Sequence, residues 1–155
     1  MGRRGIWMAA IAGFSLLIAG CDDGGADQAG ASTLFRLQPG ECFNSPAVSA
    51  GRTVRVEDVT PVPCADAHDA EVFAVLAYPA GRDAAYPGDE VVADYAASEC
   101  LLQFPGYTGS SYDDSDVEVA TIRPDRDSWD EKDDRQVACV LHQQGSTLTG
   151  SRRKA

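Results

Sequence analysis

The sequence predicts an α+β domain, in which a mainly antiparallel sheet of about four strands has one principal helix packed across it. Short segments rich in apolar and β-branched residues, separated by turn residues, indicate the strands. One longer segment that places apolar residues four apart indicates the helix. Four cysteines beyond position 40 form an even set, which suits two disulfides in a small exported domain.

The N-terminal segment, residues 1–20, has the layout of a secretory signal peptide, with Arg3 and Arg4 ahead of a charge-free apolar run. The run ends in Leu17-Ile18-Ala19-Gly20-Cys21, which resembles a bacterial lipobox: an aliphatic residue, small residues and then the cysteine. The resemblance implies thioether-linked diacylglycerol on Cys21, with further acylation such as palmitate, and cleavage before it. The alternative is that Cys21 merely follows an ordinary secretory signal.

A lipid on Cys21 would hold the protein on the outer face of the cytoplasmic membrane, because two acyl chains give stable anchoring. The Gly, Ala and Asp residues that follow are typical of a flexible tether. The expected organisation is a signal peptide at 1–20, a lipidated tether at 21–33, an extracytoplasmic domain at 34–151 and a basic tail at 152–155.

The charge balance excludes one class of partner. The chain has 24 acidic and 13 basic side chains, a net charge of −11. Loss of Arg3 and Arg4 with the signal peptide would leave 24 against 11, or −13. Such a surface repels phosphate backbones, so nucleic-acid binding is disfavoured. The expected partners are the membrane, through the lipid, and an envelope protein or cell-wall component.

Four segments have strand patterns. Thr53 to Val59 alternates apolar and charged residues, which predicts a half-solvated strand near a sheet edge. Glu71 to Tyr78 is apolar on both faces after its first residue, as expected for a central strand covered on both sides. Val117 to Ile122, which Pro124 follows, and Arg135 to Gln143 complete the predicted sheet.

The principal helix is predicted over Asp89 to Phe104, with Asp89 as a plausible N-cap and Val92, Ala96 and Cys100 four apart on its apolar side. In the last predicted strand, Cys139 shares a face with its apolar neighbours two positions away. Packing the helix on this face would bring the two cysteines together.

The cysteines Cys42, Cys64, Cys100 and Cys139 allow three pairings. We favour Cys100 with Cys139 from the packing of helix on strand, which leaves Cys42 to Cys64. A structural role is expected, because the chain has no Cys-x-x-Cys pair.

His68, Asp69 and Glu71 cluster before the buried strand, and a histidine beside carboxylates could serve as a general base. No serine lies in a G-x-S-x-G pattern, so we expect a turn with local hydrogen bonds rather than catalysis. The expectation is therefore a protein with no catalytic residues that is not an enzyme.

Two further patterns suggest metal sites without predicting them. Cys64-x3-His68 and Cys139-x2-His142 offer zinc ligands, but positions 139 and 142 point to opposite faces of a strand. Two acidic runs, Asp113–Asp116 and Asp125–Asp134, lack EF-hand spacing, so solvated loops are expected rather than calcium. We expect no metal and no cofactor.

Trp129 lies inside the second acidic run. We expect its indole to fold onto the core, with ligand stacking as the alternative. The basic tail Arg152, Arg153 and Lys154 is expected to be a frayed terminus, or alternatively to touch an anionic surface.

Spaced elements occur over roughly residues 37–151: Gly40-x-Cys42-Phe43, Val62-Pro63-Cys64-x3-His68-x2-Glu71-Val72, Tyr86-Pro87-Gly88, Cys100, Trp129, Asp134-Arg135-x-Val137-x-Cys139 and Leu148-Thr149-Gly150-Ser151. In these elements the chain resembles the septum formation domain family, small extracytoplasmic domains of actinobacterial membrane proteins and lipoproteins. The resemblance implies an interaction module in cell division or envelope assembly, without catalytic residues to carry over. The alternatives are an envelope hydrolase that uses His68 and Asp69, or a ligand-binding lipoprotein. We expect His68, Asp69, Glu71 and Trp129 to form the interaction surface.

Overall fold

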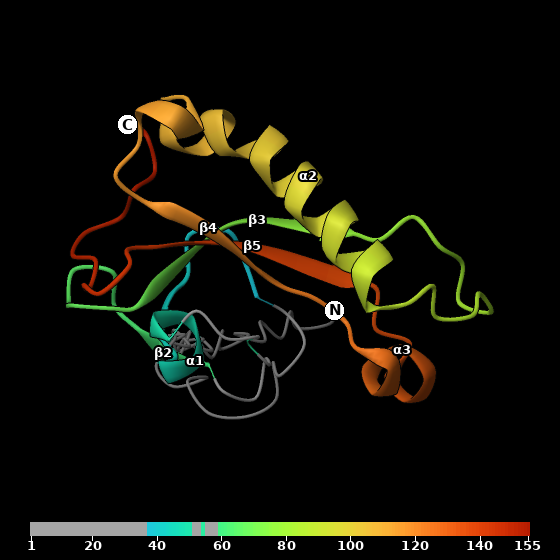
Figure 1. Ribbon diagram of the computed structural model, residues 1–155. Helices are drawn as coiled ribbons and strands as arrows, with labels where there is room; N and C mark the ends of the chain where they lie inside the picture. Colours follow the sequence, from blue (N-terminus) through green and yellow to red (C-terminus); the bar gives the residue numbers. More distant parts are fainter. Residues whose placement is uncertain (1–36, 51–53, 55–58) are drawn as a thin grey trace, which may run out of the picture. The chain divides into compact units, whose positions relative to one another are not determined.

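The computed structural model describes residues 37–50, 54 and 59–155. Within them lies a five-stranded antiparallel sheet of order β2-β1-β3-β5-β4, with one long helix across it (Figure 1). The predicted α+β class is confirmed, with one strand more than expected. The strands are β1 (Cys42–Asn44), β2 (Thr60–Val62), β3 (Ala70–Ala77), β4 (Glu118–Ile122) and β5 (Gln136–His142).

The principal helix, α2 (Asp89–Thr108), lies over one face of the sheet (Figure 1). The helix continues beyond its predicted end at Phe104, because its last turn is stabilised by the hydrogen bond from Gly109 N to Pro105 O and by the burial of Tyr107. Gly109 ends it with φ +82°, a conformation that suits glycine. The N-cap is Gly88 rather than the predicted Asp89, which is the first helical residue.

The other helical segments described are short. They are α1 (Pro46–Ser49), α3 (Arg126–Lys132) and the 3-10 turn η2 (Tyr112–Asp114). Part of the second acidic run, expected as a solvated loop, therefore forms α3. Its N-cap, Asp125, accepts a hydrogen bond from Ser128 N, while Ser128 Oγ accepts one from Asp125 N.

Strand β3 is covered on both faces, as predicted. Its pairing with β5 shifts register between Val72 and Ala74, so Phe73 is an extra residue. As a result Phe73 and Ala74 both pack on the side of α2, while Val72 packs on the opposite side. The same alternation directs Glu71 towards the side of α2, where its carboxylate meets Tyr107.

Two apolar clusters sandwich the sheet, and a third joins the start of α2 to α3. The first, between sheet and α2, includes Phe73, Ala96, Cys100, Phe104, Val137, Cys139, Leu141 and Leu148. The second, on the side of α1, includes Phe43, Ala47, Val48, Val72, Ile122, Ala138 and Val140. The third consists of Tyr86, Val92 and Trp129, with Tyr78 and Ala80 against it.

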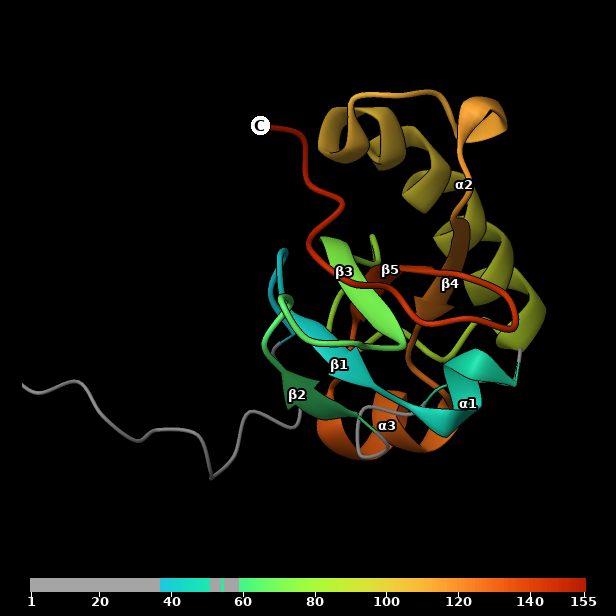
Figure 2. The same cartoon turned by 90° about the vertical axis from the view of Figure 1, so that its left-hand side faces the viewer.

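The predicted strands at Glu71–Tyr78, Val117–Ile122 and Arg135–Gln143 correspond to β3, β4 and β5. The prediction for Thr53–Val59 falls mostly on residues 51–53 and 55–58, which lie outside the described part of the chain. The neighbouring β2 is an edge strand, paired with β1 (Figure 2). No helix within the described residues is long and apolar enough to cross a membrane.

Candidate functional site

Three of the four residues predicted to form an interaction surface are inside the protein. His68 and Glu71 have no exposed area, and Trp129 is 2% exposed. Only Asp69 is partly accessible, and its carboxylate accepts a hydrogen bond from Ser45 N at 2.8 Å. The prediction that these side chains contact a partner directly is therefore wrong for His68, Glu71 and Trp129. His68 and Glu71 lie just before and at the start of the buried strand β3, and Trp129 packs against Tyr86 and Val92, so the fold covers all three.

Both disulfides have the favoured pairing. Cys42 is bonded to Cys64 and Cys100 to Cys139. The second bridge joins α2 to β5 inside the apolar cluster, where both cysteines are fully buried. The first joins β1 to the turn ahead of β3, where Cys64 is partly exposed and Cys42 is 2% exposed. The two bridges therefore differ in their access to solvent.

His68 is placed by a backbone bridge to Leu148, with N–H to O bonds of 3.0 and 2.8 Å in the two directions. Its Nδ1 lies 2.8 Å from the backbone oxygen of Asp66. Because a carbonyl only accepts, Nδ1 carries the proton and Nε2 has a free lone pair. Nε2 is buried and has no hydrogen-bond partner in the described structure.

The Glu71 carboxylate is a buried acceptor for groups from distant parts of the chain. Oε1 accepts hydrogen bonds from Tyr107 OH, at 2.5 Å, and from Ser151 Oγ, and Oε2 accepts one from Arg152 N at 2.7 Å. Donors of this kind offset the cost of burying a carboxylate. The bonds tie β3 to the end of α2 and to the C-terminal segment.

Tyr107 is the contact between Glu71 and α2. Burial raises the pKa of the Tyr107 phenol to about 12, and its hydrogen bond to the Glu71 carboxylate acts in the same direction. Tyr107 therefore stays protonated at neutral pH, and it donates to Glu71. The Arg153 guanidinium carbon lies 5.2 Å from the centre of the ring, on the side of the C-terminal segment.

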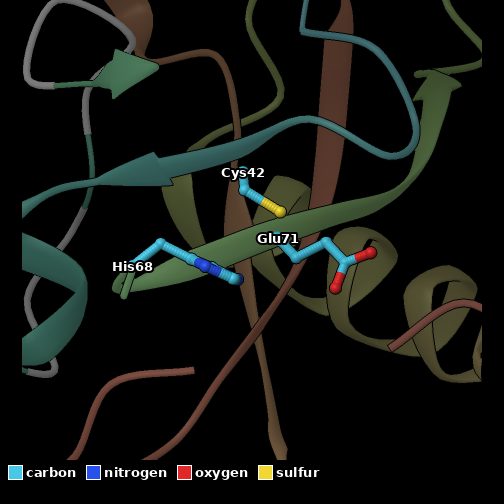
Figure 3. A group of neighbouring side chains, drawn as sticks. All are labelled: Cys42, His68 and Glu71. Atoms are coloured by element: carbon cyan, nitrogen blue, oxygen red, sulfur yellow. The ribbon is translucent and has the colours of Figure 1, made fainter. Parts of the chain in front are cut away.

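Cys42, His68 and Glu71 form one group of possible ligands, drawn in Figure 3. A ligand atom from each lies within 4.8 Å of those of the other two, and all three residues are buried. The imidazole points from the start of β3 towards the other two side chains (Figure 3). We refer to Cys42, His68 and Glu71 as the Cys-His-Glu cluster.

Comparison with known proteins places the chain in a family. The model of the family described as "Septum formation" matches residues 39–154, about three quarters of the chain. The chain belongs to the septum formation family. The chain is similar to two mycobacterial proteins, each named "Putative lipoprotein LppN", with 34% identity over 126 aligned residues. They come from Mycobacterium tuberculosis (strain ATCC 25618 / H37Rv) and Mycobacterium bovis (strain ATCC BAA-935 / AF2122/97). The aligned residues cover 79% of this chain and 65% of each relative. No solved structure matches.

The septum formation domain brings together many of the residues on which the resemblance rests. The cluster takes Cys42 from the first element and His68 and Glu71 from the second. The last element, residues 148–151, supplies the bridge to His68 and the Ser151 hydroxyl bonded to Glu71. These elements thus form one buried centre, assembled from Cys42, residues 68–71 and residues 148–151.

The C-terminal segment of the septum formation domain is packed, which corrects the expectation of a frayed basic tail. Gly150 N donates to Cys64 O at 2.7 Å, and Lys154 N donates to Tyr107 O at 2.9 Å. With the bond from Arg152 N to Glu71, these contacts hold residues 150–154 along the turn before β3 and the end of α2 (Figure 2). The basic residues therefore belong to the domain.

Trp129 packs on the core, as expected, and it pins the loop ahead of α2. Its indole N–H donates to Ala84 O at 2.8 Å, and its ring makes edge contacts with Tyr78 and Tyr86. The Arg135 guanidinium carbon lies 3.6 Å from the ring centre, a cation–π contact. Burial and a hydrogen bond to Asp89 raise the pKa of Tyr86 to about 12. Trp129 is thus a packing residue rather than an exposed ligand platform.

The geometry does not form the pair that the hydrolase alternative requires. The His68 ring is bonded to Asp66 O, and the Asp69 carboxylate to Ser45 N, so the two do not make a His–Asp pair. The preferred interpretation, a turn with local hydrogen bonds, holds for the His68 ring and Asp66 O, whereas the Asp69 carboxylate is bonded to Ser45 N, 24 residues away. The zinc set from the sequence is not assembled either, because Cys64 and Cys139 belong to different disulfides.

Sequence analysis missed three contributors to the buried centre. Tyr107 lies beyond the predicted end of α2, and Arg152 was assigned to a tail. Ser151 appeared only as the end of a family element. The useful signal was Glu71 itself, because a carboxylate at the start of a strand apolar on both faces requires buried donors.

Proposed function

We propose that this protein is a lipid-anchored, extracytoplasmic interaction module that binds another envelope protein or a cell-wall component in cell division or envelope assembly. The lipobox ending at Cys21 carries the proposal, because it would place the whole domain outside the membrane. The relatives named as lipoproteins support the anchoring, and the septum formation family supports the link to division. We propose a non-catalytic role.

The outer side of α2 is the best candidate for the contact with a partner. The residues Val91, Leu101 and Leu102 are 50%, 42% and 70% exposed, the largest exposures among the large apolar side chains described. Val91 and Leu102 are eleven residues apart, which is close to three full helical turns, so they lie in one row. Leu101 borders that row. We call Val91, Leu101 and Leu102 the outer stripe of α2.

Charge favours a particular kind of partner. The chain carries a net charge of −11, and Asp94, between the stripe residues along α2, is exposed. An apolar stripe within an acidic surface fits an apolar groove with a basic rim, since complementary charge speeds association and excludes wrong partners. The proposed partner is an envelope protein with such a groove.

Anchoring is tested by Cys21→Ala, with Gly20→Ala as the matched control that keeps a small residue before the cysteine. We expect Cys21→Ala to abolish acylation, measured by mass spectrometry of the detergent-extracted chain, and Gly20→Ala to retain it. A normally sized, acylated Cys21→Ala product would contradict the proposal.

The contact surface is tested by Leu102→Glu. Gln103→Glu is the matched control, because it adds the same charge one residue along α2, where the helix has turned by about 100°. In dividing cells, crosslinking should capture an envelope protein on the wild-type chain and the control, and at least tenfold less on Leu102→Glu. Equal capture by both variants would exclude the outer stripe of α2. Failure to find the wild-type chain at the septum or in any envelope complex would overturn the proposed function.

A further inference from the structure

The Cys-His-Glu cluster contains a buried nitrogen, His68 Nε2, that neither the hydrogen bonds of the fold nor the proposed function uses. Its three residues come from β1, the turn before β3, and β3 itself, and all are buried (Figure 3). A buried polar nitrogen without a partner costs free energy, so its presence requires an explanation. His68 Nε2 is such an atom.

His68 has the arrangement of a histidine prepared to bind a metal. Its Nδ1–H is used by the backbone oxygen of Asp66 at 2.8 Å, which fixes the ring and leaves the lone pair on Nε2. Metal-binding histidines almost always donate their other ring N–H in this way. One imidazole nitrogen of His68 lies within 4.8 Å of the ligand atoms of Cys42 and Glu71.

The Glu71 carboxylate also has one acceptor lone pair that no described donor uses. A carboxylate oxygen has two lone pairs. Oε1 uses both, for Tyr107 and Ser151, whereas Oε2 accepts only Arg152 N among the described residues. One lone pair of Oε2 is therefore available to a cation, while the three donors hold the carboxylate in place.

The sulfur ligand is blocked by oxidation, because Cys42 is bonded to Cys64. A dithiol reductant would transfer two electrons and two protons to this bond, giving two thiols and leaving the reductant as its own disulfide. A divalent cation would then displace the proton of the Cys42 thiol to solvent. Cys64 is partly exposed, so a reductant reaches this bridge, whereas Cys100 and Cys139 are both fully buried.

We propose that Cys42, His68 and Glu71 form a latent Zn²⁺ site, which becomes competent when the Cys42–Cys64 disulfide is opened, with the fourth position left to a water molecule. The set offers one thiolate, one imidazole and one carboxylate, ligand types that Zn²⁺ takes in tetrahedral sites with three protein ligands. The proposal is independent of the partner contact at α2. In the oxidised protein the Cys42 thiolate is absent and the site is closed.

Two single variants test the site without any reductant. Cys64→Ser and Cys42→Ser break the same disulfide and each leaves one thiol, but only Cys64→Ser keeps all three residues of the Cys-His-Glu cluster. The full chain, purified in detergent without an oligohistidine tag, is titrated with Zn²⁺ against a chromophoric chelator. We expect Cys64→Ser to bind one Zn²⁺ at least tenfold more tightly than Cys42→Ser. Cys21 is the same in both, so it does not affect the difference.

The ligands are then identified in the Cys64→Ser background. His68→Gln and Glu71→Gln should each weaken Zn²⁺ binding at least tenfold, and His142→Gln, the control at the other histidine, should not. Co²⁺ in place of Zn²⁺ should give a sulfur-to-cobalt absorption band and the intense visible bands of a tetrahedral site, and His68→Gln should lose the latter.

The folding state of each variant is followed by circular dichroism. If Cys64→Ser is unfolded without metal, Zn²⁺ should restore its spectrum, and no such restoration should occur for Cys42→Ser. Equal Zn²⁺ affinities for Cys64→Ser and Cys42→Ser, or binding that His68→Gln leaves unchanged, would overturn the proposal. So would wild-type protein, selectively reduced at Cys42–Cys64, that takes up no Zn²⁺.

Discussion

Removing the Cys100–Cys139 bridge should cost the domain a large share of its stability. The bridge closes a loop with a sequence separation of 39, and the loop-entropy relation then gives about 4 kcal/mol at 25 °C. The Cys42–Cys64 bridge, with a separation of 22, gives about 3 kcal/mol by the same relation. The total free energy of unfolding of a domain of this size is about 5–15 kcal/mol. The double variant Cys100→Ala/Cys139→Ala should therefore be close to the limit of folding.

Equilibrium urea unfolding followed by circular dichroism measures the effect. For a slope of about 2 kcal/mol per molar, a loss of 4 kcal/mol lowers the midpoint by about 2 M. Both cysteines are fully buried among apolar side chains, so a packing loss adds to the entropic one. The pair Cys100→Ala/Cys139→Val should recover about 1–2 kcal/mol, because it refills the space of two methyl groups. A loss below about 1 kcal/mol for the double alanine variant would refute the reasoning.

Three further predictions concern single side chains. Trp129→Ala should lower the free energy of unfolding by about 3–5 kcal/mol, because it empties a buried site. Trp129→Phe should lower it by only about 1–2 kcal/mol, mainly through the lost indole hydrogen bond. Similar melting temperatures for the two variants would contradict this prediction. Tyr107 and Tyr86 have pKa values raised from 10 to about 12. Their protonated forms are favoured by the fold, so their stabilisation is fully present below pH 10 and is lost as the pH rises towards 12. Absorbance titration should show both phenols ionising late, and a titration with all phenols near 10 would contradict it. Gly109→Ala should lower the free energy of unfolding by about 1–2 kcal/mol, because Gly109 has φ +82° and a Cβ there would lie 3.3 Å from Lys154 Cβ. Gly106→Ala, inside the same helix with open space around it, should instead stabilise by about 0.5–1 kcal/mol, and equal effects would refute the backbone argument.

The long elements were predictable because their side chains repeat. The two-residue period of β5 and the four-residue spacing along α2 placed Cys139 and Cys100 on facing surfaces, so one disulfide followed from packing and the other from elimination. The strand β3 was predicted from continuous apolarity, which is typical of a strand covered on both faces.

Short elements gave no such signal. β1 and β2 have three residues each, too few for a period to appear. The acidic residues around α3 suggested a solvated loop, although Asp125 and Ser128 form a capping box there. In this segment the local cap, rather than the overall charge, was the informative feature.

The buried centre could not be predicted from local pattern. The donors to Glu71 lie 36, 80 and 81 residues away, at Tyr107, Ser151 and Arg152. A carboxylate beside His68 and Asp69 therefore suggested an exposed surface, because its partners become neighbours only after the sheet and α2 have assembled.

The position of the C-terminal segment in the chain determines when the domain can close. The bridge to His68 and two of the donors to Glu71 come from residues 148–152, which follow β5 and are made after every strand of the sheet. Until they arrive, burying Glu71 would strand a carboxylate with too few donors, at a cost of several kcal/mol. A chain that still lacks these residues thus keeps this end of the sheet hydrated and open, and the domain closes only after its final segment has been made.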